Sequence, residues 1–162
     1  MLLFKTARLE QIHLIASFAR MVWTEHYSPI IGPEQVEYML SKYQSSEQIK
    51  SDLLSGYIYD LAWEDGNLAA YCAYRLDNDS VFLSKLYVKR EKRGRKIATH
   101  FLERLKECAR QKQKYSIILT VNKRNPSLAV YTKMGFTIID DVVIDIGAGF
   151  FMDDYLMELK FV

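Results

Sequence analysis

The chain has 162 residues, of which 49% are hydrophobic and 26% charged, and its formal net charge is +2. This balance is that of a soluble globule and excludes a disordered chain. The length fits a single domain over residues 1–162. A net charge of +2 is too small to imply nucleic-acid binding. No apolar run approaches the ~18 residues of a membrane span, and the N-terminal apolar stretch is too short for a signal peptide.

Two cysteines, Cys72 and Cys108, lie in apolar segments, and their spacing fits no metal motif. We interpret them as reduced thiols of a cytoplasmic protein, because disulfides are rare in that compartment. The sequence predicts no metal site.

The first third of the chain predicts a short strand followed by helices. "LLFKTA" is the strand candidate, and over 9–23 the apolar residues recur at helical spacing. "HYSPIIGP" interrupts this pattern with two prolines and a glycine, and Pro33 is placed to open a second helix. "SSEQIKSDLL" predicts a third helix, because Ser45 and Gln48 have the spacing of a capping box.

The middle of the chain changes to strands. "YIYDLAWE", "LAAYCAYRL" and "VFLSKLYV" are rich in aromatic and β-branched residues. The turn signals "EDGN" and "DNDS" separate them, which predicts three antiparallel strands.

The second half adds a βαβ unit and a closing hairpin. Strand 81–88, an amphipathic helix over 97–111 and the apolar strand 115–121 form the unit, whose crossover is expected to be right-handed. In "NPSLAVYTKMGF", Asn125 is placed as a cap and Gly135 as a left-handed stop. "FTIIDDVVIDI" and "YLMELKF" close the chain as strands around the loop "GAGFFMDD". The order predicts an α/β fold with a mixed, twisted sheet of six to seven strands and helices on both faces.

The run "KREKRGRK" at 89–96 carries six Lys or Arg residues in eight positions, directly before helix 97–111. Each cation there destabilises the helix start by about 0.3–1 kcal/mol, because the helix dipole already makes that end positive. A bound polyanion would offset the repulsion, and Gly94 supplies the backbone freedom of a phosphate-binding turn. A solvated basic patch is the alternative. Nucleic-acid binding is disfavoured, because the charge is confined to one turn and no recognition helix is visible.

Two segments together resemble the GCN5-related N-acetyltransferases (GNAT). "LYVKREKRGRKIATHFL" matches that family's strand and pyrophosphate loop, and "NKRNPSLAVYTKMGF" matches its later Asn and Tyr. The order of elements fits the family over the whole chain, most clearly over 57–161. The family's Arg/Gln-x-x-Gly-x-Gly/Ala pattern falls on Arg93, Gly94, Arg95, Lys96, Ile97 and Ala98. One departure is Lys96, which stands where the family has its central glycine and adds a Cβ and a positive charge.

The resemblance implies the GNAT acyl-CoA N-acyltransferase fold and an N-acetyltransferase that moves the acetyl group of acetyl-CoA to an amine acceptor. It implies that Leu86, Tyr87 and Val88 present backbone groups to the pantetheine arm and the thioester. It also implies cofactor contacts from residues 93–98, Asn125 and Lys133, and it places Tyr131 as the general acid for the leaving thiolate. A phenol, with an ordinary pKa of about 10, holds its proton at neutral pH. The alternative for Tyr131 is a packed core tyrosine, and the alternative for Asn125 is a simple helix cap.

The acceptor is expected at "WTEHYSPIIGP" and "GAGFFMDDY", which mix aromatic and acidic residues. The candidate acceptor-site residues are Glu25, His26, Tyr27, Asp153 and Asp154. The general base is sought among these acids and His26, with solvated surface charge, or a water chain to a distant carboxylate, as alternatives. The chain broadly resembles the bacterial polyamine-acetylating members, while a protein or peptide amine stays open. A non-catalytic acyl-CoA-binding protein of the same fold is the alternative function; we expect no nucleic-acid or membrane partner, and a homodimer is possible.

Overall fold

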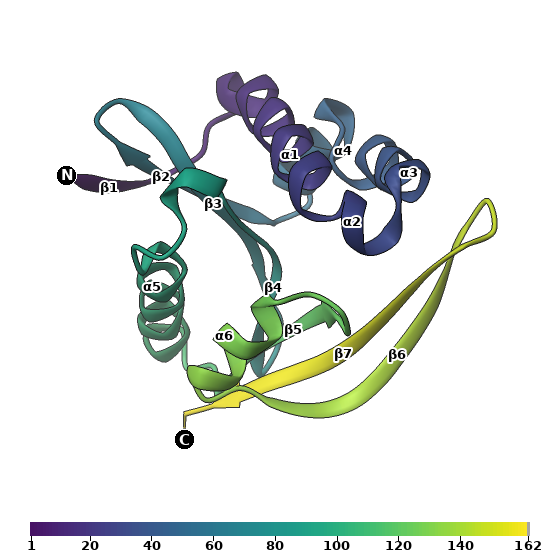
Figure 1. The fold of residues 1–162 in the computed structure, drawn as a ribbon. Coiled ribbons are helices and arrows are strands. Elements are labelled where there is room, and N and C mark those ends of the chain that lie inside the picture. Colours follow the sequence, from purple (N-terminus) through teal and green to yellow (C-terminus); the bar gives the residue numbers. More distant parts are fainter. Residues whose placement is uncertain (162) are drawn as a thin grey trace. The chain divides into compact units, whose positions relative to one another are not determined.

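The computed structural model describes residues 1–161 (Figure 1). Its strands form a seven-stranded sheet in the order β1-β2-β3-β4-β5-β7-β6. The sheet is mixed, because β4 and β5 run parallel while β1–β2, β2–β3, β5–β7 and β6–β7 run antiparallel. The predicted mixed sheet with helices is therefore confirmed. The elements are β1 (Leu2–Thr6), α1 (Ile12–His26), α2 (Ser28–Ile31), α3 (Pro33–Tyr43), α4 (Ser46–Leu54), β2 (Ile58–Glu64), β3 (Asn67–Leu76), β4 (Ser80–Val88), α5 (Ile97–Gln111), β5 (Ser116–Asn122), α6 (Ser127–Lys133), β6 (Thr137–Gly147) and β7 (Phe150–Lys160).

The chain forms two compact units, one of residues 1–75 and 85–101, the other of residues 76–84 and 102–161. β4 and α5 contribute residues to both. The prediction of a single domain stays a prediction.

In the first unit, helices α1 to α4 gather on one face of the strands (Figure 1). The apolar residues of α1 recur at helical spacing, and the stripe that they form is buried. On the sheet, Tyr59 and Tyr71 are fully buried, and the Phe18 ring of α1 meets Tyr71 edge-on at 5.7 Å. This face therefore forms the core under the helices.

The opposite face of the same strands meets the start of α5. The ring of Phe4 in β1 lies 5.0 Å from that of Phe101, in an edge-to-face arrangement. The two sides of the sheet in this unit are thus covered by different helices, as predicted. Asp65 and Gly66 both have positive φ in the β2–β3 turn, which fits the hairpin predicted from "EDGN".

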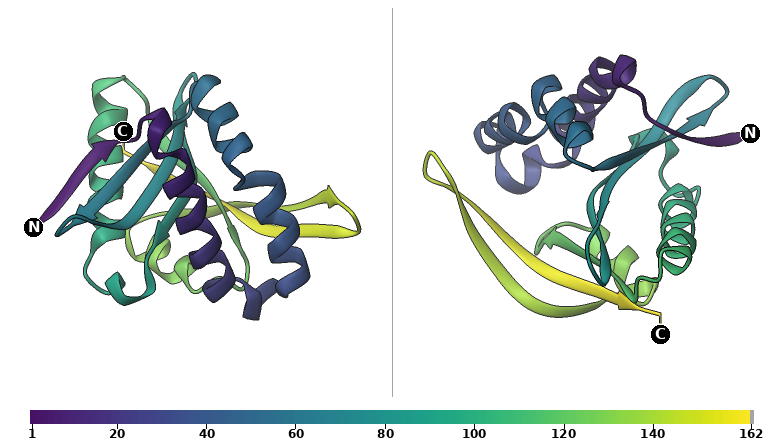
Figure 2. Two further views of the ribbon diagram at one scale, coloured as in Figure 1. Left: turned by 90° about the horizontal axis from the view of Figure 1, so that it is seen from above. Right: turned by 180° about the vertical axis from the view of Figure 1, so that it is seen from behind.

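The second unit contains the parallel pair of the βαβ motif and the closing hairpin. Val81 and Leu83 of β4 pair with Ile117 and Leu119 of β5, and all four are buried. β7 lies between β5 and β6, and β6 and β7 form a long two-stranded ribbon (Figure 2). The βαβ prediction is confirmed, and the strand at 115–121 is found over Ser116–Asn122.

Two predicted loops are partly regular structure. "HYSPIIGP" contains the short helix α2, which Pro29 can open because its missing N–H falls in the first turn, and which ends at Gly32 with φ +89°. The prediction that "GAGFFMDD" forms a loop is wrong for the residues that follow its second glycine. The turn occupies Gly147 to Gly149, where three consecutive residues have positive φ, and residues 150–154 belong to β7.

Both cysteines are reduced thiols, as predicted; Cys72 is buried and Cys108 half-buried. Among the helices of residues 1–161, none combines the length and the apolar run needed to cross a bilayer.

Candidate active site

The basic loop connects β4 to α5 within the first unit and has an unusual backbone. A 3₁₀ turn covers Arg90–Lys92, and the chain then passes through Gly94 at φ +77° and Lys96 at φ +62° before α5 begins. A non-glycine residue in this left-handed region is strained by about 1–2 kcal/mol. Lys96 therefore adopts a conformation that glycine would adopt without strain.

Carboxylates pair with only part of the loop's charge. Glu64 of β2 accepts from Lys92 at 2.6 Å and from Arg95 at 2.9 Å, and these cations lower the pKa of Glu64, with the Lys92 hydrogen bond contributing most. Arg93 donates through Nε to the Val88 carbonyl at 3.2 Å. Within residues 1–161, the exposed side chain of Lys96 has no ion-pair partner.

This donor set fits a diphosphate. Six cations in residues 89–96 face two nearby carboxylates, Glu64 and Glu91, so the loop keeps a local excess of positive charge. The first turn of α5 adds N–H groups that have no partner inside the helix. Guanidinium forks and helix-start N–H groups are the groups that bind phosphates in proteins.

The segment Leu86–Val88 precedes this loop, and its strand face is polar as well as aromatic. Lys85 and Tyr87 are buried, while Leu86 and Val88 are half-buried. Lys85 Nζ donates to the Tyr59 hydroxyl at 2.7 Å and to the Tyr43 carbonyl at 3.0 Å. Burial lowers the pKa of Lys85 to about 8, and the Asp52 carboxylate at 3.5 Å partly offsets that effect.

The sequence alone indicated no role for Lys85 or for the buried Gln44, although the pattern of β4 contained a signal for Lys85. Val81, Leu83, Lys85 and Tyr87 alternate along β4, so a lysine occupies the face of the strand that is otherwise apolar or aromatic.

Asn125, Tyr131 and Lys133 belong to the second unit. Asn125 is buried, and its Oδ1 accepts the Ser127 N–H at 2.9 Å, so it serves the start of α6 as predicted, although the helix begins at Ser127. Tyr131 is 9% exposed and packs edge-on against Phe136 at 5.7 Å. Gly135 has φ +103°, as expected of the stop after this helix, and Lys133 is exposed.

The structure separates the two adjacent acids of β7. Asp153 is exposed and forms an ion pair with Lys123 at 2.9 Å. Asp154 points to the other face of the strand, where it is only 4% exposed. Burial, and then the charge of Asp153, raise the pKa of Asp154 to about 6. Asp154 is therefore the acid suited to proton transfer near neutral pH.

Glu25, His26 and Tyr27 lie at the end of α1 in the first unit. Glu25 is exposed, and His26 meets the Tyr27 ring edge-on at 4.7 Å. His26 Nδ1 also lies 3.5 Å from Arg93, which links the predicted acceptor segment to the basic loop.

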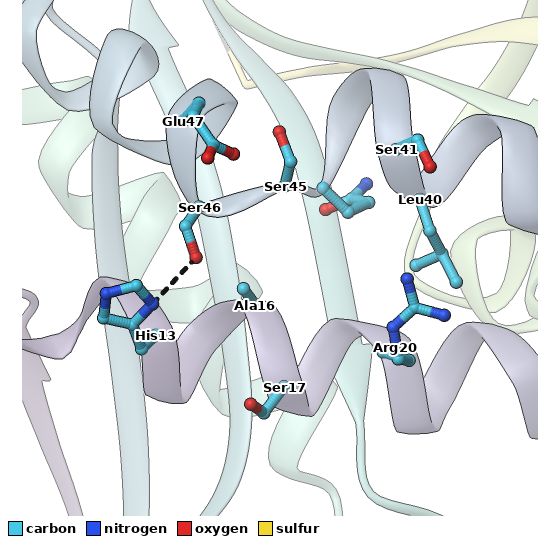
Figure 3. A pocket seen from close by; sticks show the side chains of 10 residues that line it. His13, Ala16, Ser17, Arg20, Leu40, Ser41, Ser45, Ser46 and Glu47 are labelled. Carbon is cyan, nitrogen blue, oxygen red and sulfur yellow. Dashed lines mark hydrogen bonds between the residues drawn. The ribbon is translucent and has the colours of Figure 1, made fainter.

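A cavity of about 480 Å³ lies elsewhere in the first unit, between α1 and the α3–α4 junction (Figure 3). His13 Nδ1 and the Ser46 hydroxyl meet across it at 3.0 Å, and Arg20 lies at its other end. None of the site residues predicted from the sequence lines the cavity, whereas Gln44 does.

The sequence profile of the Acetyltransferase (GNAT) family matches residues 16–136. This chain belongs to the GNAT acetyltransferase family. The match spans most of the chain and includes the basic loop and Tyr131. The prediction of an acetyl-CoA-dependent acyltransferase is thereby confirmed at the level of the family.

Solved structures share the fold of this GNAT chain at low sequence identity. The PaiA N-acetyltransferase of Thermoplasma acidophilum, in complex with coenzyme A, is 21% identical, with a TM-score of 0.86 and 99% of each chain covered. A GCN5-related N-acetyltransferase from Rhodopseudomonas palustris is 16% identical, with a TM-score of 0.83 and 98% and 95% coverage. YncA from Salmonella typhimurium, solved with acetyl-CoA, is 19% identical, with a TM-score of 0.67 and 98% and 93% coverage. Among curated proteins, none matches the sequence.

Metal ligands do not gather in this structure. Over residues 1–161, no group of three or more His, Cys, Asp or Glu side chains is arranged to hold a metal ion.

Replacing Lys96 by glycine is expected to raise the free energy of unfolding by about 1 kcal/mol, because glycine adopts φ +62° without a Cβ clash. Chemical denaturation at neutral pH measures the change. Lys96→Met is the matched control, since it removes the charge and keeps the Cβ. If Lys96→Met stabilises the protein as much as Lys96→Gly, charge repulsion and not backbone strain is the source.

Proposed function

We propose that this protein is an acetyl-CoA-dependent N-acetyltransferase acting on a primary amine. The observation that carries the proposal is the β4–α5 loop, where left-handed Gly94 and Lys96 and a surplus of cations meet the first turn of a helix. A diphosphate bound there would offset the repulsion that these cations otherwise impose on the helix start. The complexes of two fold neighbours with coenzyme A and acetyl-CoA support the choice of ligand.

Acetyl-CoA would supply an activated acetyl thioester, and the residues of this chain would hold and protonate the reacting groups. Arg93, Arg95 and Lys96 would bind the diphosphate, and backbone groups of 86–88 would orient the thioester arm. The same resemblance assigns cofactor contacts to Asn125 and Lys133. These roles follow the family resemblance, residue by residue.

The proton balance of the reaction requires a base and an acid. The reaction forms one C–N bond and breaks one C–S bond, so one proton leaves the acceptor nitrogen and one reaches the departing sulfur. Asp154 is the base in this proposal, because its raised pKa of about 6 leaves it ionised at pH 7 and more basic than an ordinary carboxylate. Tyr131 is the acid.

The buried charge of Asp154 supports a functional role. A carboxyl group whose pKa is raised on folding binds more protons in the folded state, so stability is lost as pH rises from about 4 to about 6. The folded protein therefore bears this penalty at neutral pH. Ionisable groups that are kept buried at such a cost are candidates for catalysis.

The acceptor in this proposal is a cationic amine, either a polyamine-like small molecule or a protein or peptide amine. Asp154, and separately the exposed Glu25 of the first unit, would supply negative charge that attracts such a group. The PaiA neighbour is an N-acetyltransferase, which agrees with an amine acceptor.

Titration calorimetry with coenzyme A, combined with a thiol-release assay on polyamines and Lys-containing peptides, tests the function. We expect saturable binding of coenzyme A, and turnover of at least one amine above background hydrolysis. Binding without turnover of any amine would favour the non-catalytic alternative. No binding at millimolar concentration would overturn both readings.

Tyr131→Phe is expected to lower kcat by about 10²-fold, the range of a lost general acid, with the coenzyme A dissociation constant nearly unchanged. The phenyl ring keeps the packing against Phe136. Tyr115→Phe is the matched control in the same unit, because Tyr115 is 54% exposed. An unchanged kcat in Tyr131→Phe would remove the phenol from the mechanism.

Asp154→Asn is expected to lower kcat/KM by about 10²-fold at pH 7.5 without destabilising the protein, because it also removes a buried charge. In the wild type, kcat/KM should fall as pH drops below about 6 and Asp154 becomes protonated; the variant should lack this limb. The control is Asp79→Asn, which removes an exposed acid of the same unit. A retained acidic limb in Asp154→Asn would assign the base elsewhere.

A further inference from the structure

The junction between α3 and α4 holds β4 at two points just before the basic loop. The backbone carbonyl of Tyr43 accepts from Lys85 Nζ at 3.0 Å. The side-chain Nε2 of the next residue, Gln44, donates to the Tyr87 hydroxyl at 3.3 Å. Lys85 and Tyr87 are two residues apart and so lie on the same face of the strand. Two consecutive residues of the junction therefore hold the strand on either side of Leu86.

Further hydrogen bonds fix these anchors to the neighbouring elements. The Tyr59 hydroxyl of β2 accepts from Lys85 at 2.7 Å and donates to Asp52 of α4 at 2.7 Å. The Tyr71 hydroxyl of β3 donates to Gln44 Oε1 at 3.3 Å. Gln44 is thus held between two tyrosines, and Lys85 is bonded to groups from three elements.

Burying Lys85 in this network lowers the stability of the folded protein. Lys85 is 7% exposed, and removing an ammonium group from water is unfavourable even when the group is paired. Because folding lowers its pKa, the unfolded chain binds more protons between about pH 8 and 10.5, so the penalty is full below pH 8 and fades above it. Apolar residues in such a place are often neutral or stabilising. The retention of a buried lysine here therefore indicates a role other than stability.

We propose that Lys85 and Gln44 are positioning residues for acetyl transfer, which fix the segment Leu86–Val88 so that its backbone groups meet the thioester at a constant angle. The inference rests on the proposed function. Neither side chain touches the reacting atoms in this account; both act through the strand. Loss of the anchor should therefore reduce kcat more than affinity for coenzyme A, because the cations that bind the diphosphate lie in the loop beyond the strand.

The first test replaces Lys85 by methionine, with Lys50→Met as the matched control on the exposed face of α4. We expect Lys85→Met to lower kcat at least tenfold while the coenzyme A dissociation constant, from calorimetry, stays within about twofold. Lys50→Met should change neither. An unchanged kcat, or an equal loss in both quantities, would overturn the proposal.

A double variant guards against misfolding. Lys85→Met alone leaves the Asp52 carboxylate without its ammonium partner, whereas Lys85→Met with Asp52→Leu removes both charges of the pair. The double variant should be stable and still slow. A stable double variant with wild-type kcat would also overturn the proposal.

The pH dependence of kcat gives a readout that loss of stability alone would not produce. The groups bonded to Lys85 are Asp52 from α4, Tyr59 from β2 and the Tyr43 carbonyl, and the Tyr71 ring of β3 stacks on that of Tyr59. The pKa values of Tyr59 and Tyr71 are raised, so neither ionises near pH 8. A fall in wild-type kcat above about pH 8 that disappears in Lys85→Met is expected. If kcat of Lys85→Met still falls above about pH 8, the proposed positioning role of Lys85 is contradicted.

Two substitutions of Gln44 test whether its hydrogen bonds to the tyrosines affect kcat. Gln44→Leu removes both tyrosine contacts and should lower kcat, whereas Gln44→Glu keeps an acceptor for both hydroxyls and should restore part of the rate. Equal rates in the two variants would exclude the Gln44 contribution. If the wild type neither binds coenzyme A nor acetylates an amine, the proposed function fails; if it does both and these variants match it, only the anchor fails.

Discussion

The positive charge gathered at the start of α5 is the constraint from which the functional account follows. It opposes the helix dipole, and one of its members, Lys96, holds a left-handed backbone that a lysine adopts under strain. Glu64 pairs with two of the cations and Glu91 with a third, so the loop keeps an excess of positive charge. Both effects weaken the free protein, and a polyanion bound at the loop would neutralise the repulsion and offset the strain. A solvated patch would explain the charge but would give no reason for the left-handed geometry.

Three residues of this protein are held in states that reduce its stability. Lys96 is strained, Lys85 is a buried cation, and Asp154 is a buried acid with a raised pKa. Proteins depart from local rules mainly where function requires it. Lys96 and Lys85 flank the strand end and loop expected to hold the acetyl donor, and Asp154 lies on a segment expected to meet the acceptor. The departures therefore fall on functional segments and not at random over the fold.

The elements that sequence predicted well are those with a clear period. Each of three apolar patterns predicted its element correctly: the helical spacing in α1, the alternation in β4 and the continuous apolar run in β5. The "EDGN" turn likewise predicted the hairpin that joins β2 to β3. The β6–β7 turn was misjudged because two adjacent aspartates look like a loop, whereas alternation in a strand sends Asp153 to solvent and Asp154 inward. The anchor of Lys85 was beyond the sequence, since its partners lie 26 to 42 residues away along the chain and meet it only in the folded register.

The two buried charges also define the conditions under which the proposed chemistry works. Burial raises the pKa of Asp154 to about 6 and lowers that of Lys85 to about 8, because low-dielectric surroundings disfavour either charged form. Between these values Asp154 is ionised and able to take a proton, while Lys85 keeps the charge with which it holds β4. The same physical effect, acting with opposite sign on an acid and a base in different units, thus confines the competent state to a window around neutral pH. An exposed acid and an exposed lysine, with ordinary pKa values near 4 and 10.4, would leave that window several units wider.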